Sequence, residues 1–226
     1  MIKAVAFDLD GTLINTLYSL EDTMNKTLNF YNLDGITLDE TKQFIGYGYK
    51  TFVEKALNKN IMNRNDKSLI NLLNDLQNKY LEIFKYNSTY NLVPYDGIFE
   101  TINKLKKDNI YIICITNKPE GEAVKVLNSV FDENTFDIIS GDDNNHPLKP
   151  NPMLLDSILN KLSITKAEII HIGDSKTDIE FANNAKIKSI GCTYGFREKA
   201  ELIKYNPTSL VDNAYELYDT IKKLNI

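Results

Sequence analysis

Residues 2–13 of this 226-residue chain have the sequence IKAVAFDLDGTL, an apolar segment that ends in two acids and a glycine. The part from Ile2 to Leu9 is rich in Val, Ala and Phe and alternates little between apolar and polar residues, which predicts a strand buried on both faces. Gly11 interrupts that strand. Two acidic side chains, Asp8 and Asp10, therefore stand where the strand gives way to a loop.

Strand and helix patterns alternate from Val93 to the end of the chain. Apolar runs predict strands at 110–115, 136–139, 169–172, 189–193 and 210–211. Helical spacing of apolar residues fills the segments between them, and Pro119 and Pro152 suit the first turns of two of these helices. Such alternation predicts an α/β fold, a doubly wound, Rossmann-like parallel sheet with helices on both faces.

The segment from residue 15 to residue 91 follows a different pattern. Its apolar residues recur at helical spacing, as in the set Leu69, Leu72, Leu73, Leu76 and Tyr80, and no strand is predicted there. A structureless loop of this length would be implausible. We therefore expect a helical-bundle cap domain at 15–91, inserted into a catalytic core formed by 1–14 and 92–226. The only arginine of the insertion, Arg64, lies in a polar stretch and is expected at the surface.

Charge and cysteine content exclude several classes of protein. Lys and Arg number 26 against 31 Asp and Glu, a net charge of −5, which argues against a nucleic-acid-binding protein. The only cysteines, Cys114 and Cys192, lie in apolar runs, so inert core residues and a reducing compartment are expected rather than a disulfide framework. No apolar stretch approaches the roughly 20 residues of a membrane span. We expect a cytoplasmic protein with no membrane partner.

Polar side chains gather at the predicted strand ends. In an open parallel sheet, ligands bind outside the carboxyl ends of the strands. The side chains expected there are Asp8, Asp10, Thr116, Asn117, Lys149, Asp174 and Asp178. Crowded carboxylates favour a hard divalent cation with oxygen ligands, and Mg²⁺ is the expected cofactor. A lysine, a threonine hydroxyl and fixed N–H groups suit the binding of phosphoryl oxygens. The set therefore suits phosphoryl transfer onto a carboxylate, a known form of covalent catalysis.

Each of these groups also has an ordinary structural interpretation. Two acids after a strand can form a polar turn, Thr-Asn pairs are common in turns, and most lysines are solvated. The acids of the segment 173–178 can stabilise the start of a helix. Of the six prolines, Pro147, Pro150 and Pro152 surround Lys149, and a stiff loop there favours a functional lysine. His171 is expected to be a packed or hydrogen-bonded structural residue, and His146 a solvated one.

Four segments taken together resemble a known family in their order and spacing. They are Asp8-Leu9-Asp10-Gly11-Thr12, Thr116-Asn117, Lys149-Pro150 and Gly173-Asp174-Ser175-Lys176-Thr177-Asp178. They resemble the signature motifs of the haloacid dehalogenase-like (HAD) hydrolases, and the sequence around the second and fourth is most similar to the phosphoglycolate phosphatase-like branch. The resemblance covers essentially the whole chain, with the helical insertion in the place of that superfamily's cap. Many relatives have Asp at the position of Asn15.

The resemblance implies a role for each acid and for the lysine. Asp8 would be the nucleophile and a metal ligand. Asp10 would be the general acid and base, with its backbone carbonyl on the metal. Lys149 would hold the phosphate and the nucleophile. Asp174 would ligate Mg²⁺, and Asp178 would contribute to the metal site directly or through a bound water.

The resemblance also implies substrate contacts. Gly11, Thr116 and Asn117 would bind the phosphate together with Lys149. Within the insertion, Gly46-Tyr47-Gly48-Tyr49-Lys50 lies between two predicted helices, and Tyr47 is a candidate substrate contact. An ordinary helix–helix turn is the alternative interpretation of that segment.

The resulting expectation is a Mg²⁺-dependent phosphatase that hydrolyses a small phosphorylated metabolite through an aspartyl-phosphate, with phosphoglycolate as the first candidate. The alternatives are a sugar-phosphate mutase, a pyrophosphatase or a non-catalytic phosphate-sensing protein. Mutases of this superfamily use a histidine early in the cap, whereas both histidines of this chain lie outside the insertion. The absence of a G-x-x-x-x-G-K-[ST] run excludes a P-loop NTPase. Both a monomer and a homodimer are compatible with the sequence.

Overall fold

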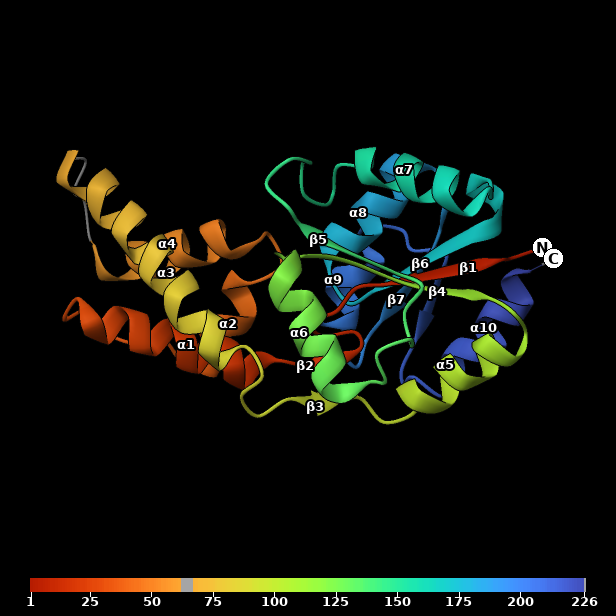
Figure 1. Ribbon diagram of the computed structural model, residues 1–226, viewed down its shortest axis with the longest axis horizontal. Coiled ribbons are helices and arrows are strands. Elements are labelled where there is room, and N and C mark those ends of the chain that lie inside the picture. Colours follow the sequence, from red (N-terminus) through yellow and green to blue (C-terminus); the bar gives the residue numbers. More distant parts are fainter. Residues whose placement is uncertain (62–66, 226) are drawn as a thin grey trace. The chain divides into compact units, whose positions relative to one another are not determined.

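The computed structural model describes residues 1–61 and 67–225 and divides into two compact units (Figure 1). The first comprises Met1–Asn15 and Val93–Ile226, and the second comprises Thr16–Leu92. Arg64 lies outside the described residues. Among the helices that are described, none is long and apolar enough to cross a membrane.

The first unit is built on a parallel sheet of six strands in the order β5-β4-β1-β6-β7-β8. The central strand β1 pairs with β4 on one side and with β6 on the other, and Phe7 stands opposite both Cys114 and Ile172. The strands are β1 (Ala4–Phe7), β4 (Tyr111–Pro119), β5 (Ile138–Asp142), β6 (Ile169–Gly173), β7 (Lys188–Cys192) and β8 (Ser209–Val211). The carboxyl ends of β1 and β6 are therefore level, which brings the loops after them together. The predicted parallel α/β sheet is confirmed.

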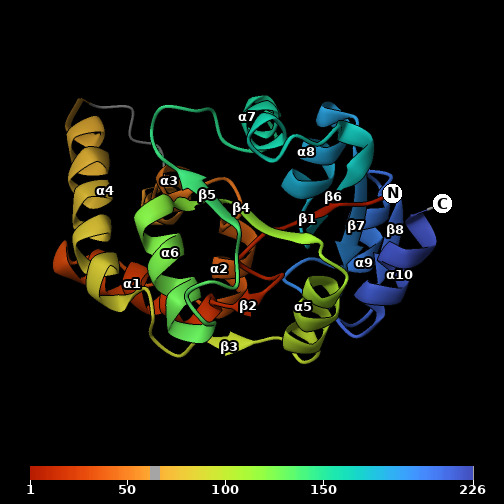
Figure 2. The same cartoon turned by 45° about the vertical axis from the view of Figure 1, so that its right-hand side comes forward.

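Helices cover both faces of this sheet (Figure 2). On one face, α7 (Met153–Leu162) and α8 (Lys176–Ala185) bury Leu155, Ile158 and Phe181 against Ala4 and Ala6 of the central strand. On the other face lie α5 (Ile98–Lys107) and α10 (Glu216–Leu224). The remaining elements are α6 (Glu120–Val130), the 3₁₀ turn η1 (Lys166–Glu168) and α9 (Lys199–Ile203). The helices thus cover the two faces of the sheet, and the ends of the strands remain available for polar groups.

Some predicted boundaries are wrong. Strand β4 continues to Pro119, where the sequence predicts an end at Ile115 and a helix that includes Pro119. The pairing of β4 with β5 shifts register after Ile115 and resumes with Pro119 opposite Asp142. Polar residues at a strand end carry no apolar period, so the apolar pattern stops before the backbone pairing does.

Two very short strands lie where the chain leaves and re-enters the first unit. Ile14–Asn15 (β2) and Val93–Pro94 (β3) pair antiparallel, with Asn15 opposite Val93. The sequence did not predict them, because two residues are too few to show a period. Their pairing places the two ends of the intervening segment side by side.

The second unit is helical, as the spacing of its apolar residues predicts. Its described residues form α1 (Leu17–Phe30), α2 (Leu38–Phe44), α3 (Tyr49–Asn60) and α4 (Lys67–Asn87). Tyr80 of α4 is buried and lies 5.8 Å from the ring of Phe52 and 5.3 Å from that of Phe84, measured between ring centroids. Aromatic pairs at these separations add to the stability of a small core. The role of this unit as a cap stays a prediction.

Candidate active site

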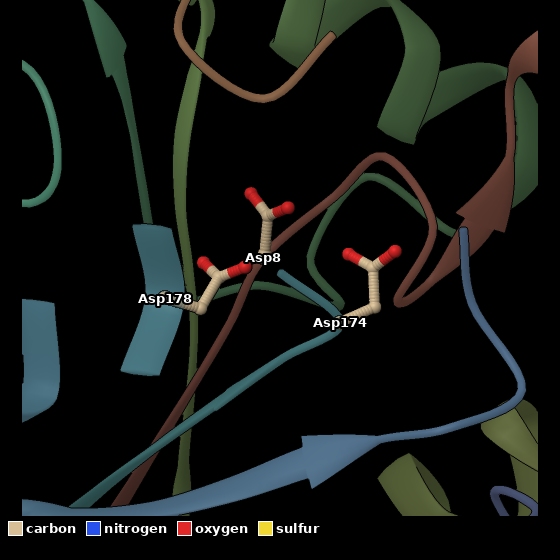
Figure 3. A group of neighbouring side chains, drawn as sticks. All are labelled: Asp8, Asp174 and Asp178. Atoms are coloured by element: carbon tan, nitrogen blue, oxygen red, sulfur yellow. The ribbon is translucent and has the colours of Figure 1, made fainter. Parts of the chain in front are cut away.

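Three buried aspartates meet at the carboxyl ends of the central strands (Figure 3). Asp8 directly follows β1, Asp174 directly follows β6, and Asp178 lies in the first turn of α8. One carboxylate oxygen from each lies within 4.8 Å of the others. The level ends of β1 and β6 produce this convergence, as the sequence predicts from the position of each acid.

Lys149 supplies a positive charge to this cluster from a loop far along the chain. Its Nζ donates hydrogen bonds to Oδ1 of Asp8 at 2.8 Å, to Oδ1 of Asp178 at 2.7 Å and to the carbonyl oxygen of Ile115 at 2.7 Å. The lysine is buried, so its three donors are held in one arrangement rather than solvated.

The side chain of Asn117 fixes the lysine loop. Its Oδ1 accepts a hydrogen bond from the backbone N–H of Lys149 at 2.8 Å, and its Nδ2 donates to the carbonyl of the same residue at 3.0 Å. The hydroxyl of Thr116, also buried, accepts from the backbone N–H of Lys118 at 3.3 Å. The amide of Asn117 thus positions Lys149, while the phosphate contacts expected of Thr116 and Asn117 stay predictions.

The carboxylate of Asp178 has hydrogen-bond partners on both oxygens. Oδ1 accepts from Lys149 and lies 3.0 Å from Nε2 of His171. Oδ2 accepts from the backbone N–H of Ser175 at 3.2 Å and from its hydroxyl at 2.5 Å. These contacts tie Asp178 to the start of its own helix and to the lysine.

The carboxylate of Asp174 is held more loosely. Its Oδ2 accepts from the backbone N–H of Phe196 at 2.7 Å, and its Oδ1 accepts a long bond of 3.4 Å from the hydroxyl of Thr12. Two glycines make room for it. A Cβ on Gly11, whose φ is +89°, would lie 2.3 Å from Oδ2 of Asp174, and a Cβ on Gly195 would lie 2.3 Å from its Cβ. Gly11 therefore serves the site by leaving space for this acid.

Asp10 is held by a lysine that sequence reasoning missed. Nζ of Lys118 lies 2.8 Å from one carboxylate oxygen of Asp10 and 2.9 Å from the other. Lys118 is 6% exposed, so the pair is shielded from solvent on the lysine side. The only signal in the sequence was its place directly after Thr116-Asn117. The backbone N–H of Phe196 was also missed, because a main-chain donor leaves no mark on the residue type.

Burial and crowding change the proton affinity of these groups. Burial, together with the negative charges of Asp178 and Asp10, raises the pKa of Asp8 to about 7 against the opposing charge of Lys149. Burial and the neighbouring Asp178 and Asp8 raise the pKa of Asp174 well above its ordinary value. Burial disfavours the ammonium of Lys149, but the charges of Asp178 and Asp8 outweigh it and raise the lysine pKa. For Asp178, Lys149 and His171 outweigh burial and lower the pKa.

This charge balance fits a divalent cation. Three carboxylates face one ammonium in the cluster, and burial together with repulsion between the acids raises the pKa of Asp8 and Asp174 even though Lys149 is bonded to Asp8. Oxygen donors of this kind suit Mg²⁺. Among the described residues, no group donates a hydrogen bond to Oδ2 of Asp8. In the same part of the chain, Oδ1 of Asp174 accepts only the long bond from Thr12, whereas both oxygens of Asp178 have close donors. Asp8 and Asp174 are thus better placed than Asp178 to bind a cation directly.

The remaining predictions concern residues outside the cluster. His171 is buried and hydrogen-bonded to Asp178, and Cys114 and Cys192 are buried free thiols, as the sequence predicts. His146 is exposed, as expected, and pairs with Asp143 at 2.9 Å.

The loop from Gly46 to Lys50 belongs to the second unit. Gly46 and Gly48 both have positive φ, and α3 begins at Tyr49, directly after Gly48. Tyr47 is 36% exposed, with Nζ of Lys55 5.0 Å from the centroid of its ring. The contact of Tyr47 with a substrate stays a prediction.

A family model described as haloacid dehalogenase-like hydrolase matches residues 5–192, most of the chain and all four segments of the site. The protein belongs to the haloacid dehalogenase-like hydrolase family. It is 30% identical over 222 residues to the phosphoglycolate phosphatase of Colwellia psychrerythraea, covering 98% of this chain and 97% of that protein. It is 29% identical over 225 residues to the phosphoglycolate phosphatase of Photobacterium profundum, covering 98% and 96%.

Solved structures agree with the fold of this HAD hydrolase. A crystal structure of "a predicted phosphatase" from Clostridium acetobutylicum matches with a TM-score of 0.85 at 25% identity and covers 99% of both chains. Another, described as "a predicted phosphoglycolate phosphatase" from Haemophilus somnus, has a TM-score of 0.88 at 22% identity and covers 97% of this chain and 98% of that one. The identity of the second is low enough that it supports the fold alone. Together the comparisons place the chain in the phosphoglycolate phosphatase-like branch and support a phosphatase enzyme.

Proposed function

We propose that this hydrolase is a Mg²⁺-dependent phosphomonoesterase that acts through an aspartyl-phosphate on Asp8. The proposal rests on three side chains that lie together at the carboxyl ends of the central strands. Asp8 would be the nucleophile, Lys149 is hydrogen-bonded to it, and Asp174 is the second acid. Asp8 and Asp174 would hold the Mg²⁺, with the backbone carbonyl of Asp10 and a water-mediated contribution from Asp178. When bound, Mg²⁺ supplies positive charge that offsets the repulsion between an anionic phosphate and the carboxylates.

The first half of the reaction transfers the phosphoryl group to the enzyme. A carboxylate oxygen of Asp8 attacks phosphorus, and the bond from phosphorus to the ester oxygen breaks. Asp10 donates a proton to that leaving oxygen, so the alcohol departs neutral. The ammonium of Lys149, which touches Asp8 in the structure, is placed to stabilise the negative charge on the phosphoryl oxygens, and the hydroxyl of Thr116 adds a donor.

The second half returns the enzyme to its starting state. Asp10, now a carboxylate, accepts a proton from a water molecule as that water attacks the phosphorus of the aspartyl-phosphate. Inorganic phosphate is released, and Asp8 is regenerated. We further propose that the helical unit 16–92 excludes bulk water during these steps, with Tyr47 among its substrate contacts.

Phosphoglycolate is the first substrate candidate, because proteins similar over nearly the whole chain are named phosphoglycolate phosphatases. A panel of phosphorylated metabolites assayed with and without Mg²⁺ tests this choice. Phosphate release from phosphoglycolate at a higher kcat/KM than from the other esters is expected. A product that retains its phosphate, formed only with a bisphosphate activator, would instead indicate a mutase.

Replacing the nucleophile tests the mechanism. Asp8→Asn removes the attacking carboxylate but keeps its shape, so kcat is expected to fall by about a thousandfold or more. The matched control is Asp108→Asn. This acid follows α5 and lies just before β4, at the amino ends of the strands and so away from the site. Phosphate release by Asp8→Asn at a rate close to that of the control would refute the aspartyl-phosphate.

A further inference from the structure

His171 is the polar exception in an apolar strand. Strand β6 has the sequence IIHIG and is buried along its length, and His171 itself is 0% exposed. The register places it beside Ala6 on β1 and Ser189 on β7. Its ring meets that of Phe181 edge-on at 4.9 Å between centroids. Packing alone does not require an imidazole here, because Ile169, two residues earlier on the same face of the strand, fills its position with an apolar side chain.

The two nitrogens of the ring differ in their hydrogen bonds. Nε2 lies 3.0 Å from Oδ1 of Asp178, whereas Nδ1 is the buried side-chain atom that has no hydrogen-bond partner within the described parts of the chain. Burial lowers the pKa of His171, while the contacts of the ring with Asp178 and with the backbone of Ala6 act in the opposite direction. Since an ionised Asp178 can only accept, Nε2 carries a proton, and Nδ1 is a buried polar atom without a hydrogen-bond partner among the residues described.

A buried polar atom without a hydrogen-bond partner is unfavourable, so the histidine costs stability at this position. What it provides is the bond to Asp178. The same Oδ1 that accepts from His171 also accepts from Lys149 at 2.7 Å, while Ser175 holds Oδ2. Both oxygens of the carboxylate are thereby held by hydrogen bonds. Lys149 in turn donates to Asp8 at 2.8 Å, so the position of the ammonium at the nucleophile depends on that carboxylate.

We propose that His171 is a positioning residue that holds the Asp178 carboxylate in place and so orients Lys149. The proposal rests on the proposed phosphatase function. It assigns His171 no contact with the substrate. Residues that support the groups around a metal site typically change affinity or activity by about 10–100-fold when they are replaced.

Two substitutions separate this role from simple packing. His171→Leu removes both ring nitrogens and resembles the neighbouring isoleucines. We expect its kcat to fall about tenfold or more, while its melting temperature stays at or above that of the wild type because the unpartnered Nδ1 is gone. His171→Gln keeps a side-chain N–H that can reach Asp178 and is expected to recover most of the kcat.

The control is Ile169→Val, which shortens a fully buried side chain two residues earlier in the same strand. It should lower the melting temperature without a selective loss of kcat. Wild-type kcat in His171→Leu would overturn the proposal. So would a loss of activity that follows the melting temperature across all three variants and is not recovered by glutamine.

A second measurement needs no turnover. The chain has two histidines, so ¹⁵N spectra of the wild type and of His146→Gln identify the ring signals of His171. A neutral ring protonated on Nε2 is expected, and Lys149→Met should shift that signal because both side chains share Oδ1 of Asp178. A ring protonated only on Nδ1, or a signal unaffected by Lys149→Met, would refute the assignment. If the wild-type protein had no phosphatase activity, the proposed function would be refuted. The spectra would still decide whether His171 is bonded to Asp178 through Nε2.

Discussion

At the scale of single residues, the contact of Lys118 with Asp10 gives the general acid and base of the proposed mechanism a fixed orientation. Both oxygens of Asp10 lie within 2.9 Å of the same ammonium. A carboxylate that must give a proton to one oxygen of the substrate and take one from a water benefits from being held in a single rotamer.

Lys118→Met is therefore expected to lower kcat by about 10–100-fold with little change in KM, because general acid–base catalysis commonly contributes that much or more. Lys118→Arg should restore part of the loss. Steady-state kinetics with the candidate substrate measure both effects. Lys125→Met, in the following helix with a side chain 42% exposed, is the control and should be neutral. Equal kcat in the Lys118→Met and Lys125→Met variants would show that the ion pair is not used in the reaction.

Most residues of the cluster could be predicted from the sequence, and the reasons for the exceptions are physical. Asp8, Asp174 and Lys149 were predicted because they follow strands or lie in a stiff loop, and the structure brings them together. Lys118 was not, because most lysines are solvated and nothing in a single sequence marks one as buried. Its contact with Asp10 depends on a strand, β4, that runs further than its apolar pattern.

At the scale of elements, the first turn of α8 links helix stability to the site. Asp178 accepts hydrogen bonds from the N–H and the hydroxyl of Ser175, the residue that precedes the helix. An acid at this position also interacts favourably with the helix dipole. The same carboxylate both stabilises the helix start and holds Lys149.

Ser175→Ala should therefore have two effects. Loss of a hydroxyl bond to a charged acceptor is expected to lower the free energy of unfolding by about 1–2 kcal/mol, and looser support of Asp178 should reduce kcat several-fold. Urea denaturation and kinetics measure the two effects. Ser157→Ala is the control, since its hydroxyl bonds to a backbone carbonyl within α7 and is exposed. A loss no greater than that of Ser157→Ala would contradict the role given to this turn.

Long periodic elements were predictable and short ones were not. The order of strands and helices after residue 92 follows from alternating apolar patterns, and the parallel sheet follows from that alternation. The two-residue strands β2 and β3 exist because their backbones meet, which depends on the rest of the fold and leaves no local pattern.

At the scale of the whole molecule, the acid cluster should link stability, pH and cation binding. The pKa of Asp8 rises from 3.8 to about 7 on folding. The ion-free folded state therefore holds a proton that the unfolded state has lost, and this contribution to stability is fully present below about pH 4 and disappears as pH rises through 7. A bound cation takes the place of that proton.

Stabilisation by Mg²⁺ should thus increase with pH across this range. We expect the rise in melting temperature caused by millimolar Mg²⁺ to be larger at about pH 8 than at about pH 6, since protons compete with the cation at low pH. Thermal denaturation with and without Mg²⁺ measures it. In Asp8→Asn the difference between the two pH values should shrink. An equal rise at both pH values in the wild-type protein would argue against a cation at these acids.

The pairing of Asn15 with Val93 has a consequence for how such a chain can be rebuilt. Because the two ends of the segment 16–92 lie at neighbouring points, the segment is a graftable module that can be removed as a unit. A tight Asn-Gly turn can then connect the two antiparallel strands. A shortened chain that joins Asn15 to Val93 through such a turn is expected to melt cooperatively with the circular dichroism of an α/β protein. Failure of that minimal chain to fold would mean that the sheet depends on the excised helices. Success would make the junction of Asn15 and Val93 a graft point at which foreign helical modules can be inserted and assayed for a change in the choice of substrate.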